Sequence, residues 1–243
     1  MINFGLIGKS LIHSFSPGYF NKKFKEQELD DHAYLAFEIP SISKLPDILK
    51  LHPGLKGLNV TIPYKQSVLH YLHVKHQMVD KTGACNCIKI ADGKLHGFNT
   101  DVNGFYGAIK PLLLPHHKQA LILGSGGSSK AVAEAFNQLQ IEHKTVSREV
   151  KPGYVNYEDL DEEMMASHTI IVNTTPLGMF PEIKDCPPVP YQYVSPRHLM
   201  FDLIYNPAQT IFLKKGEEQG AVTENGYNML VLQAEESWKI WNA

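Results

Sequence analysis

Several polar segments in the first hundred residues stand where a short β-rich run gives way to a turn or a helix. They are residues 13–17, 59–65, 83–86 and 97–101. Their serine, threonine, asparagine, lysine and aspartate side chains suit a small ligand with several hydroxyl groups and one carboxylate. Helix capping is the alternative interpretation, with Ser16 as an N-cap before Pro17 and with Asn99 or Asp101 as the cap of the next helix.

Lys65 and Asp101 add a cation and a carboxylate to this cluster. Helix capping does not explain why both are present. The reduction of a carbonyl needs a hydride donor and a group that gives a proton to the developing alkoxide. A lysine tuned by burial and by a nearby aspartate can provide that proton. We therefore interpret Lys65 as the acid/base group and Asp101 as the residue that orients it through a hydrogen bond.

A glycine-rich turn follows the apolar run 120–123 and precedes a helical pattern with Val132, Ala135 and Phe136 on one face. The turn reads Gly124-Ser125-Gly126-Gly127-Ser128-Ser129. In dinucleotide-binding proteins the first glycine permits a tight turn, and the second lets the backbone approach the pyrophosphate. The helix N-terminus then offers unpaired N–H groups to the phosphates. The pattern predicts a dinucleotide site, with a plain strand-to-helix turn as the alternative.

The end of the next predicted strand, Ser147-Arg148-Glu149, bears on which dinucleotide is bound. A protein that binds NAD places an acid there for the ribose 2′-hydroxyl, whereas an arginine accommodates the 2′-phosphate of NADP. Arg148 presents a planar fork of donors that suits a phosphate, so NADP is favoured. Glu149 leaves NAD open, because it takes the acidic role if the turn is shifted by one residue. A solvated surface charge is the other interpretation of Arg148.

Short β-rich runs alternate with helical patterns along the chain, which is typical of βαβ units and a mostly parallel sheet. We expect strands at residues 3–8, 33–39, 57–62, 119–123, 144–146, 169–172, 199–203 and 221–223, and a hairpin over 86–97. The pattern indicates two domains with a break near residue 102. An apolar stripe from Leu230 to Trp241 predicts a last helix, whose packing partner the pattern does not decide.

The composition excludes several classes of protein. The chain has 243 residues, of which 43% are hydrophobic and 20% charged, and its net charge is −2. These values are those of a globular protein without a basic surface for nucleic acid or an anionic membrane. The apolar runs are far shorter than the roughly 18 residues of a membrane-spanning helix, and the start lacks a signal-peptide pattern. We therefore expect a soluble cytoplasmic protein with neither a nucleic-acid nor a membrane partner.

Cysteines and histidines point to no further cofactor. Three cysteines do not make a disulfide framework in a chain of this length. The candidate metal ligands among the twelve histidines are His13, His70, His73, His76, His116 and His117. No partner set rich in cysteine or glutamate stands near them, so we predict no metal. The oligomeric state stays open, with a homodimer as one alternative.

The polar segments and the glycine turn, taken in order, resemble the shikimate dehydrogenase family. The resemblance covers about residues 4–241. It rests on Ser14-Phe15-Ser16-Pro17, on residues 59–65, on Gly83-Ala84-Cys85-Asn86, on Asn99-Thr100-Asp101, on Gly124-Ser125-Gly126-Gly127, on residues 173–179 and on residues 229–234. It implies NADPH-dependent reversible reduction of 3-dehydroshikimate to shikimate, in the biosynthesis of aromatic amino acids.

The resemblance also implies a fold and a set of contacts. An N-terminal α/β substrate domain, 1–101 with 227–243, would be joined to a Rossmann-like NADP domain, 102–226, and the last helix would return to the first domain. Ser14 and Ser16 would hold the substrate carboxylate. The ring hydroxyls and the carbonyl would be held by Thr61, Lys65, Asn86, Asp101 and Gln233, and Tyr205 would reach across from the cofactor domain. The NADP site would be lined by Gly124, Ser125, Gly126, Gly127, Ser128, Ser147, Arg148, Thr174, Leu203 and Gly226.

The chain departs from the family pattern at some positions, so other functions remain as alternatives. Ser147-Arg148-Glu149 stands where the family commonly has Asn-Arg-Thr, so a quinate/shikimate dehydrogenase that uses NAD is one alternative. Glu235 stands where smaller residues are common. A non-catalytic dinucleotide-binding protein of the same fold is a second alternative, against which the presence of both Lys65 and Asp101 argues. A related folate dehydrogenase would need other side chains in place of Ser14 and Ser16.

Overall fold

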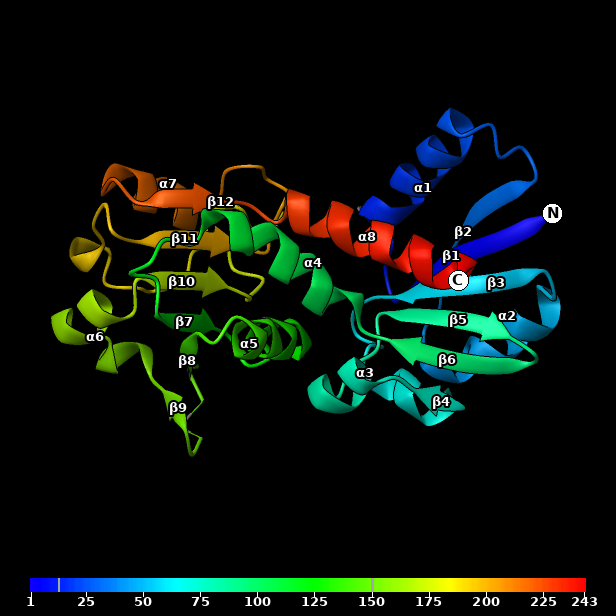
Figure 1. Ribbon diagram of the computed structural model, residues 1–243, viewed down its shortest axis with the longest axis horizontal. Coiled ribbons are helices and arrows are strands. Elements are labelled where there is room, and N and C mark those ends of the chain that lie inside the picture. The colour runs from blue at the N-terminus through cyan, green and yellow to red at the C-terminus, as the bar shows by residue number, and fades with distance from the viewer. Residues whose placement is uncertain (13, 150) are drawn as a thin grey trace. The chain divides into compact units, whose positions relative to one another are not determined.

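The computed structural model describes residues 1–12, 14–149 and 151–243, which fold into two compact units (Figure 1). The first unit consists of Met1–Thr100 with Ala234–Ala243, and the second unit consists of Asp101–Gln233. Within the described residues, each unit contains one six-stranded sheet. The predicted α/β class is confirmed, with a mixed sheet in the first unit and a parallel sheet in the second.

The sheet of the first unit has the strand order β2-β1-β3-β5-β6-β4. Its strands are β1 (Ile2–Gly8), β2 (His32–Glu38), β3 (Leu55–Val60), β4 (Val74–Lys75), β5 (Cys87–Ala91) and β6 (Lys94–Phe98). Strand β1 pairs in parallel with β2 and β3, whereas β5 runs antiparallel to both β3 and β6. The predicted hairpin is confirmed: Asp92 and Gly93, both with positive φ, form the two-residue turn between β5 and β6.

Helices α1 (Phe15–Glu26) and α8 (Tyr227–Asn242) share one hydrophobic cluster with β1 and β2 of the first sheet. Trp241 of α8 stacks on Phe4 of β1 with ring centroids 4.8 Å apart. Its indole N–H donates a hydrogen bond to the carbonyl of Ile88 over 3.0 Å. A second cluster of this unit contains residues of α2 (Leu45–Leu51), α3 (Gln77–Thr82) and the 3-10 segment η2 (Ser67–Tyr71). The end of the chain therefore completes the core of the unit that contains its beginning.

The start of α1 differs from the capping prediction. The helix begins at Phe15, and its N-cap is Ser14, whose backbone is extended and whose side chain makes no capping hydrogen bond. Ser16 is already inside the first turn and is 8% exposed. The prediction that Ser16 is the N-cap is therefore wrong, because the helical backbone starts ahead of Pro17. Proline is tolerated throughout the first turn, since the N–H that it lacks would have no intrahelical partner there.

The sheet of the second unit is parallel and has the order β12-β11-β10-β7-β8-β9. Its strands are β7 (Gln119–Leu123), β8 (Glu142–Val146), β9 (Tyr154–Val155), β10 (Ile170–Asn173), β11 (Leu199–Asp202) and β12 (Val222–Glu224). In chain order this is the doubly wound arrangement 3-2-1-4-5-6 read from the other end, which reverses direction between β7 and β10. Ligands of such sheets bind outside the carboxyl ends of the strands at this point of reversal.

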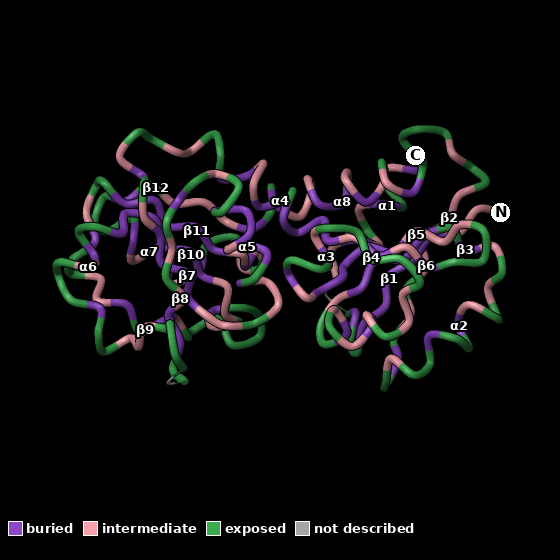
Figure 2. The backbone as a smooth tube through the Cα atoms, turned by 60° about the horizontal axis from the view of Figure 1, so that its bottom comes forward, coloured by how far each residue is buried: buried purple, intermediate pink, exposed green. Residues whose placement is uncertain are grey.

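Helices pack on the second sheet from chain segments that alternate with its strands. They are α4 (Thr100–Ile109), α5 (Gly127–Gln138), α6 (Glu162–Ser167) and α7 (Ile211–Glu218), with short 3-10 segments η3 (Lys110–Leu112), η4 (Tyr157–Asp159) and η5 (Tyr191–Tyr193). Phe105 of α4 meets Phe136 of α5 and Phe201 of β11 edge-on. A Cβ at Gly104 would lie 2.8 Å from the carbonyl oxygen of Met229, so α4 needs glycine where the first half of α8 crosses it. The buried strands form the centre of the unit (Figure 2).

Three buried histidines, His117, His168 and His198, precede β7, β10 and β11. They lie at the amino ends of these strands, opposite to the edge at which sheets of this kind bind ligands. Burial lowers the pKa of each of them. The Nδ1 atoms of His117 and His198 accept hydrogen bonds from the backbone N–H groups of Leu114 and Ser195, so a proton on either Nδ1 would displace its donor.

We expect acid to destabilise the protein through these histidines. Because their folded pKa values are lowered, the unfolded chain binds protons first, and stability falls as pH drops below about 6.5. Asp202 acts in the opposite sense, since burial raises its pKa to about 6. The measurement is therefore the difference in urea midpoint between the native chain and His198→Gln from pH 8 to pH 5. A difference that stays constant over this range would contradict the expectation.

Candidate functional site

The topology of the first sheet brings three polar segments to one edge. Strand β3 ends at Val60, and β5 begins opposite that end because the two strands are antiparallel. The next strand, β6, ends at Phe98, opposite Cys87. Thr61, Asn86 and Thr100 therefore leave the sheet at the same edge. The two polar side-chain atoms of Asn86 bond to Thr100: Nδ2 donates to Oγ1 over 3.0 Å, and Oδ1 accepts from the backbone N–H over 2.7 Å.

Lys65 lies four residues after Thr61 in the chain, and Asp101 directly follows Thr100. The carbonyl of Lys65 accepts from the N–H of Cys85 over 2.7 Å, which ties Lys65 next to Asn86. The side chain of Lys65 is half-buried. Asp101 follows Thr100, is 7% exposed and lies in the first turn of α4, where the helix dipole favours a negative charge. The hydrogen bond between Lys65 and Asp101 stays a prediction.

A buried polar network underlies the same edge. The hydroxyl of Tyr34 donates to Oδ1 of Asn59 over 2.7 Å, and Nδ2 of Asn59 donates to Ser237 of α8 over 3.0 Å and to the carbonyl of Asn86 over 3.2 Å. The amide of Asn99 donates to Thr82 and to the carbonyl of Ala84, so it braces the end of α3. These bonds fix the backbone from which Thr61 and Asn86 project.

The two serines predicted to hold a carboxylate lie at the start of α1. Ser14 is half-buried and Ser16 is buried. His13, which the sequence analysis considered as a metal ligand, lies outside the described residues. The role of both serines as substrate contacts stays a prediction.

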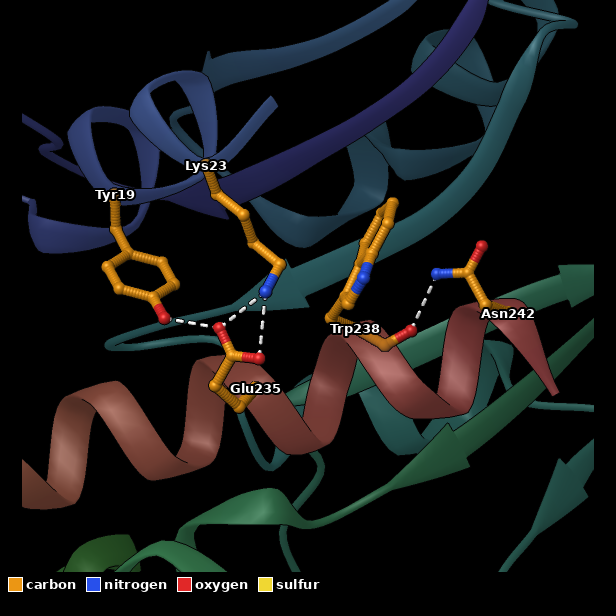
Figure 3. Close-up of polar contacts among 5 residues, drawn as sticks. All are labelled: Tyr19, Lys23, Glu235, Trp238 and Asn242. Carbon is orange, nitrogen blue, oxygen red and sulfur yellow. Dashed lines mark hydrogen bonds and ion pairs between the residues drawn. The ribbon is translucent and has the colours of Figure 1, made fainter. Parts of the chain in front are cut away.

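Glu235 of α8 accepts hydrogen bonds from two side chains of α1 (Figure 3). The ammonium of Lys23 lies 2.7 and 2.8 Å from the two carboxylate oxygens, and the hydroxyl of Tyr19 donates to one of them. Burial raises the pKa of Glu235, but these donors outweigh it and hold the pKa below its usual value. Tyr19 in turn stacks on Phe15, between the two serines, with ring centroids 5.0 Å apart. In the sequence, Glu235 is visible only as a departure from the family pattern, which assigns it no role.

We expect Glu235→Gln to lower the free energy of unfolding by about 1 kcal/mol, because it removes the charge that Lys23 faces in a partly buried pair. Urea denaturation monitored by tryptophan fluorescence measures it, since Trp238 and Trp241 are on the same helix. Glu236→Gln is the matched control: Glu236 is a neighbour on α8 and pairs at 3.6 Å with Lys239, which is largely exposed. Equal losses in the two variants would rule out a special contribution from Glu235.

The second unit places the predicted cofactor residues at the carboxyl ends of its strands. Gly124 follows β7 with a φ of 105°, and a Cβ there would lie 2.9 Å from Oγ1 of Thr174 after β10. A Cβ at Gly126 or Gly127 would meet nothing within 4 Å, so the backbone of the turn is open to a ligand. The hydroxyl of Ser129 donates to the carbonyl of Gly126 over 2.6 Å and closes the turn on α5. Ser125 and Ser128 are half-buried in the same turn.

Ser147 and Arg148 line a surface pocket of about 490 Å³ after β8, together with Asn156, Tyr157, Glu158 and Pro188. Ser147 is buried, and its Oγ accepts from the N–H of Glu149 over 3.1 Å. Burial raises the pKa of Tyr157 to about 12, although the charge of Arg148 works against this shift. Arg148 therefore places its positive charge at the pocket.

Glu149 is paired with Lys151 by an ion pair. The hydrogen bond from Lys151 lowers the pKa of Glu149. Both side chains are at least half exposed, and Glu149 does not line the pocket that Arg148 lines. Glu149, the acid for which the sequence analysis kept NAD as an alternative, is therefore paired with a lysine.

The remaining predicted residues lie on the loops after β10 and β11 and on α8. Thr174 donates through Oγ1 to the carbonyl of Leu123 over 2.6 Å, and Leu203 donates through its N–H to the carbonyl of Asn173 over 3.0 Å. A Cβ at Gly226 would lie 2.1 Å from the carbonyl oxygen of Leu203. Tyr205 is half-buried, which raises its pKa, and Gln233 is 7% exposed on α8. The structure thus brings the predicted cofactor residues of β7, β10 and β11 together.

Neither a metal centre nor a membrane-spanning helix is found in the part of the chain that the structure describes. There, no group of three or more histidine, cysteine, aspartate or glutamate residues is arranged to hold a metal ion. No helix over the same residues has the length and apolar character needed to cross a membrane.

Comparison with known proteins identifies the family. A family model described as the shikimate dehydrogenase substrate binding domain matches residues 6–88. A protein of Clostridium beijerinckii named shikimate dehydrogenase (NADP(+)) is 38% identical over 252 residues, which cover 98% of this chain and 91% of the relative.

Solved structures agree with that match. Shikimate dehydrogenase 1 from Peptoclostridium difficile is 37% identical with a TM-score of 0.86, over 100% of this chain and 92% of that one. The shikimate 5-dehydrogenase of Thermus thermophilus, solved in complex with NADP(H) and shikimate, is 28% identical with a TM-score of 0.88, over 99% and 93% of the two chains. The resemblance seen in the sequence is confirmed, and the chain belongs to the shikimate dehydrogenase family.

Proposed function

We propose that this chain catalyses the NADPH-dependent, reversible reduction of 3-dehydroshikimate to shikimate, a step in the biosynthesis of aromatic amino acids. The observation that carries the proposal is the match along nearly the whole chain to relatives named shikimate dehydrogenase (NADP(+)). The hydroxyl and amide side chains at the edge of the first sheet supply chemistry that suits a polyhydroxylated acid. The parallel sheet of the second unit supplies the usual frame for a dinucleotide.

In this proposal, substrate contacts come from both units, and the second unit also binds the cofactor. The proposed substrate contacts are Ser14, Ser16, Thr61 and Asn86 of the first unit, and Tyr205 and Gln233 of the second unit. The second unit binds NADP. The residues present fit that cofactor, because the backbone at Gly126 and Gly127 is open to a phosphate and Arg148 lines a pocket after β8. A cytoplasmic location is part of the proposal, because three cysteines do not make a disulfide framework in a chain of this length.

Lys65 is the acid/base group of the proposed reaction, and Asp101 orients it. NADPH, when bound, supplies a hydride to the substrate carbonyl. The ammonium of Lys65 gives its proton to the carbonyl oxygen as the alkoxide develops, and it recovers the proton from solvent. In the reverse direction, the neutral amine of Lys65 takes the hydroxyl proton of shikimate. The carboxylate of Asp101 accepts a hydrogen bond from the ammonium of Lys65 in this proposal and so fixes the direction of the side chain.

We expect Lys65→Ala to lower kcat by about 10²–10⁴-fold with a small change in the KM for shikimate, because a positioned general acid contributes a factor of this size. Reduction of NADP with shikimate as substrate, followed by absorbance, measures it. Lys56→Ala is the matched control, since Lys56 lies exposed on β3. If the alanine variant at position 65 keeps the native kcat, the assignment of Lys65 is wrong.

The choice between NADP and NAD depends on Arg148 in this proposal. We expect Arg148→Ala to raise the KM for NADP about 10-fold or more, because it removes charge-assisted bonds to the 2′-phosphate. The KM for shikimate and the kinetics with NAD should stay close to native. Arg197→Ala is the control, since the side chain of Arg197 is exposed in the loop before β11. Equal losses with NADP and NAD would show that Arg148 does not read the phosphate.

A further inference from the structure

Asp202, the last residue of β11, is a buried carboxylate for which the reaction above has no use. It is 0% exposed. Its Oδ1 accepts from Nδ2 of Asn173 and from the N–H of Ile204, each over 3.0 Å. Its Oδ2 accepts from the hydroxyl of Thr210 over 2.6 Å. A buried carboxylate is costly, and here three neutral donors hold it in place.

The partners of Asp202 each fix a different segment of the second unit. Oδ1 of Asn173 accepts from the N–H and the hydroxyl of Thr175 over 3.0 and 2.7 Å, which closes the turn after β10. Thr210 is the N-cap of α7, since its Oγ1 accepts from the N–H of Leu213. The bond to Ile204 sets the first turn after β11. The loops after β10 and β11 and the start of α7 are therefore joined through one carboxylate.

These loops contain predicted cofactor contacts. Thr174 lies between Asn173 and Thr175, and its hydroxyl reaches the end of β7 at Leu123. Leu203 lies between Asp202 and Ile204. Both predicted contacts are thus flanked in the chain by residues that belong to the carboxylate network. A change in that network would move both Thr174 and Leu203.

The surroundings of Asp202 make its charge sensitive to pH near neutrality. Burial raises the pKa of Asp202 to about 6, although its hydrogen bonds from Thr210, Ile204 and Asn173 lower it in part. The titratable group that faces it from η5 is Tyr191, whose pKa is raised by burial and then by neighbours that include Asp202. From α7, the ammonium of Lys215 lies 4.6 Å from the centre of the Tyr191 ring. Protonation of Oδ2 removes the acceptor to which the hydroxyl of Thr210 donates, and it replaces a charge-assisted hydrogen bond with a neutral one.

We propose that Asp202 is a positioning residue for the NADP site: its ionised carboxylate holds the loops after β10 and β11 in the binding geometry, and its protonation loosens them. This inference rests on the proposed function, because it takes the second unit as the NADP-binding unit. Asp202 does not touch the cofactor in this proposal and acts through Asn173 and Thr210. Binding of NADPH therefore weakens as pH falls through the range in which Asp202 takes up its proton.

The test is the dissociation constant of NADPH, measured by the fluorescence of the reduced nicotinamide from pH 8 to pH 5 without substrate. Asp202→Asn imitates the protonated acid in shape. We expect it to weaken binding about 10-fold at pH 8, the factor for one charge-assisted hydrogen bond. A phosphate monoester itself titrates near pH 6. The decisive quantity is therefore the ratio of the two dissociation constants, which should fall toward one as the pH drops below 6.

Thr210 provides a matched pair of controls. Thr210→Ser keeps the hydroxyl that donates to Asp202 and should bind NADPH as the native chain does, whereas Thr210→Val loses the donor and should weaken binding. Thermal unfolding of each variant separates folding from positioning. A purely structural Asp202 would give a lower melting temperature with an unchanged dissociation constant, and that result would overturn the inference. Absence of NADPH binding by the native chain would instead overturn the proposed function as well.

Discussion

The direction of the strands is the constraint that positions the predicted contact residues within each unit. Hydrogen bonding between parallel β7, β8, β10 and β11 puts all their carboxyl ends at one edge, so the residues that follow Leu123, Val146, Asn173 and Asp202 become neighbours. In the first unit a parallel strand and an antiparallel hairpin achieve the same result, because β3 and β6 end where β5 begins. Polar side chains are common at this edge, because the backbone N–H and C=O groups that leave the sheet need hydrogen-bond partners and side chains supply some of them.

Local pattern was enough to predict most strands, the hairpin and the glycine turn. Each depends on residues close in sequence: Asp92-Gly93 forms a two-residue turn, and Gly124 needs a positive φ directly after a buried run. The start of α1 was predicted wrongly, because the same local pattern allows either Ser14 or Ser16 to precede the first turn. Because serine is a good N-cap residue at either position, the sequence does not decide whether the helix begins after Ser14 or after Ser16.

The side-chain hydrogen bonds and the ion pair that hold these segments in place could not be predicted, because they join residues far apart in the chain. Asn59 and Ser237 are 178 positions apart, and Lys23 and Glu235 are 212 positions apart. Neither pair follows from periodicity, which reports the face of an element and not the side chain opposite to it. In the structure, Asn173 and Asp202 are each the polar last residue of an otherwise apolar strand. Such a local pattern is compatible with a place at the end of a strand, but it does not name the partner across the sheet.

Glu235 and Asp202 show why two shielded carboxylates acquire different properties in one chain. Burial disfavours the charge of both, but Glu235 faces the ammonium of Lys23, which restores its charged form and lowers its pKa. Asp202 faces only neutral donors among its hydrogen-bond partners in the described chain, so burial prevails and its pKa rises. The first carboxylate therefore stays ionised and clamps α1 to α8 at any pH near neutrality. The second changes its charge within that range, and for this reason it is Asp202, and not Glu235, that can link cofactor binding to the proton concentration.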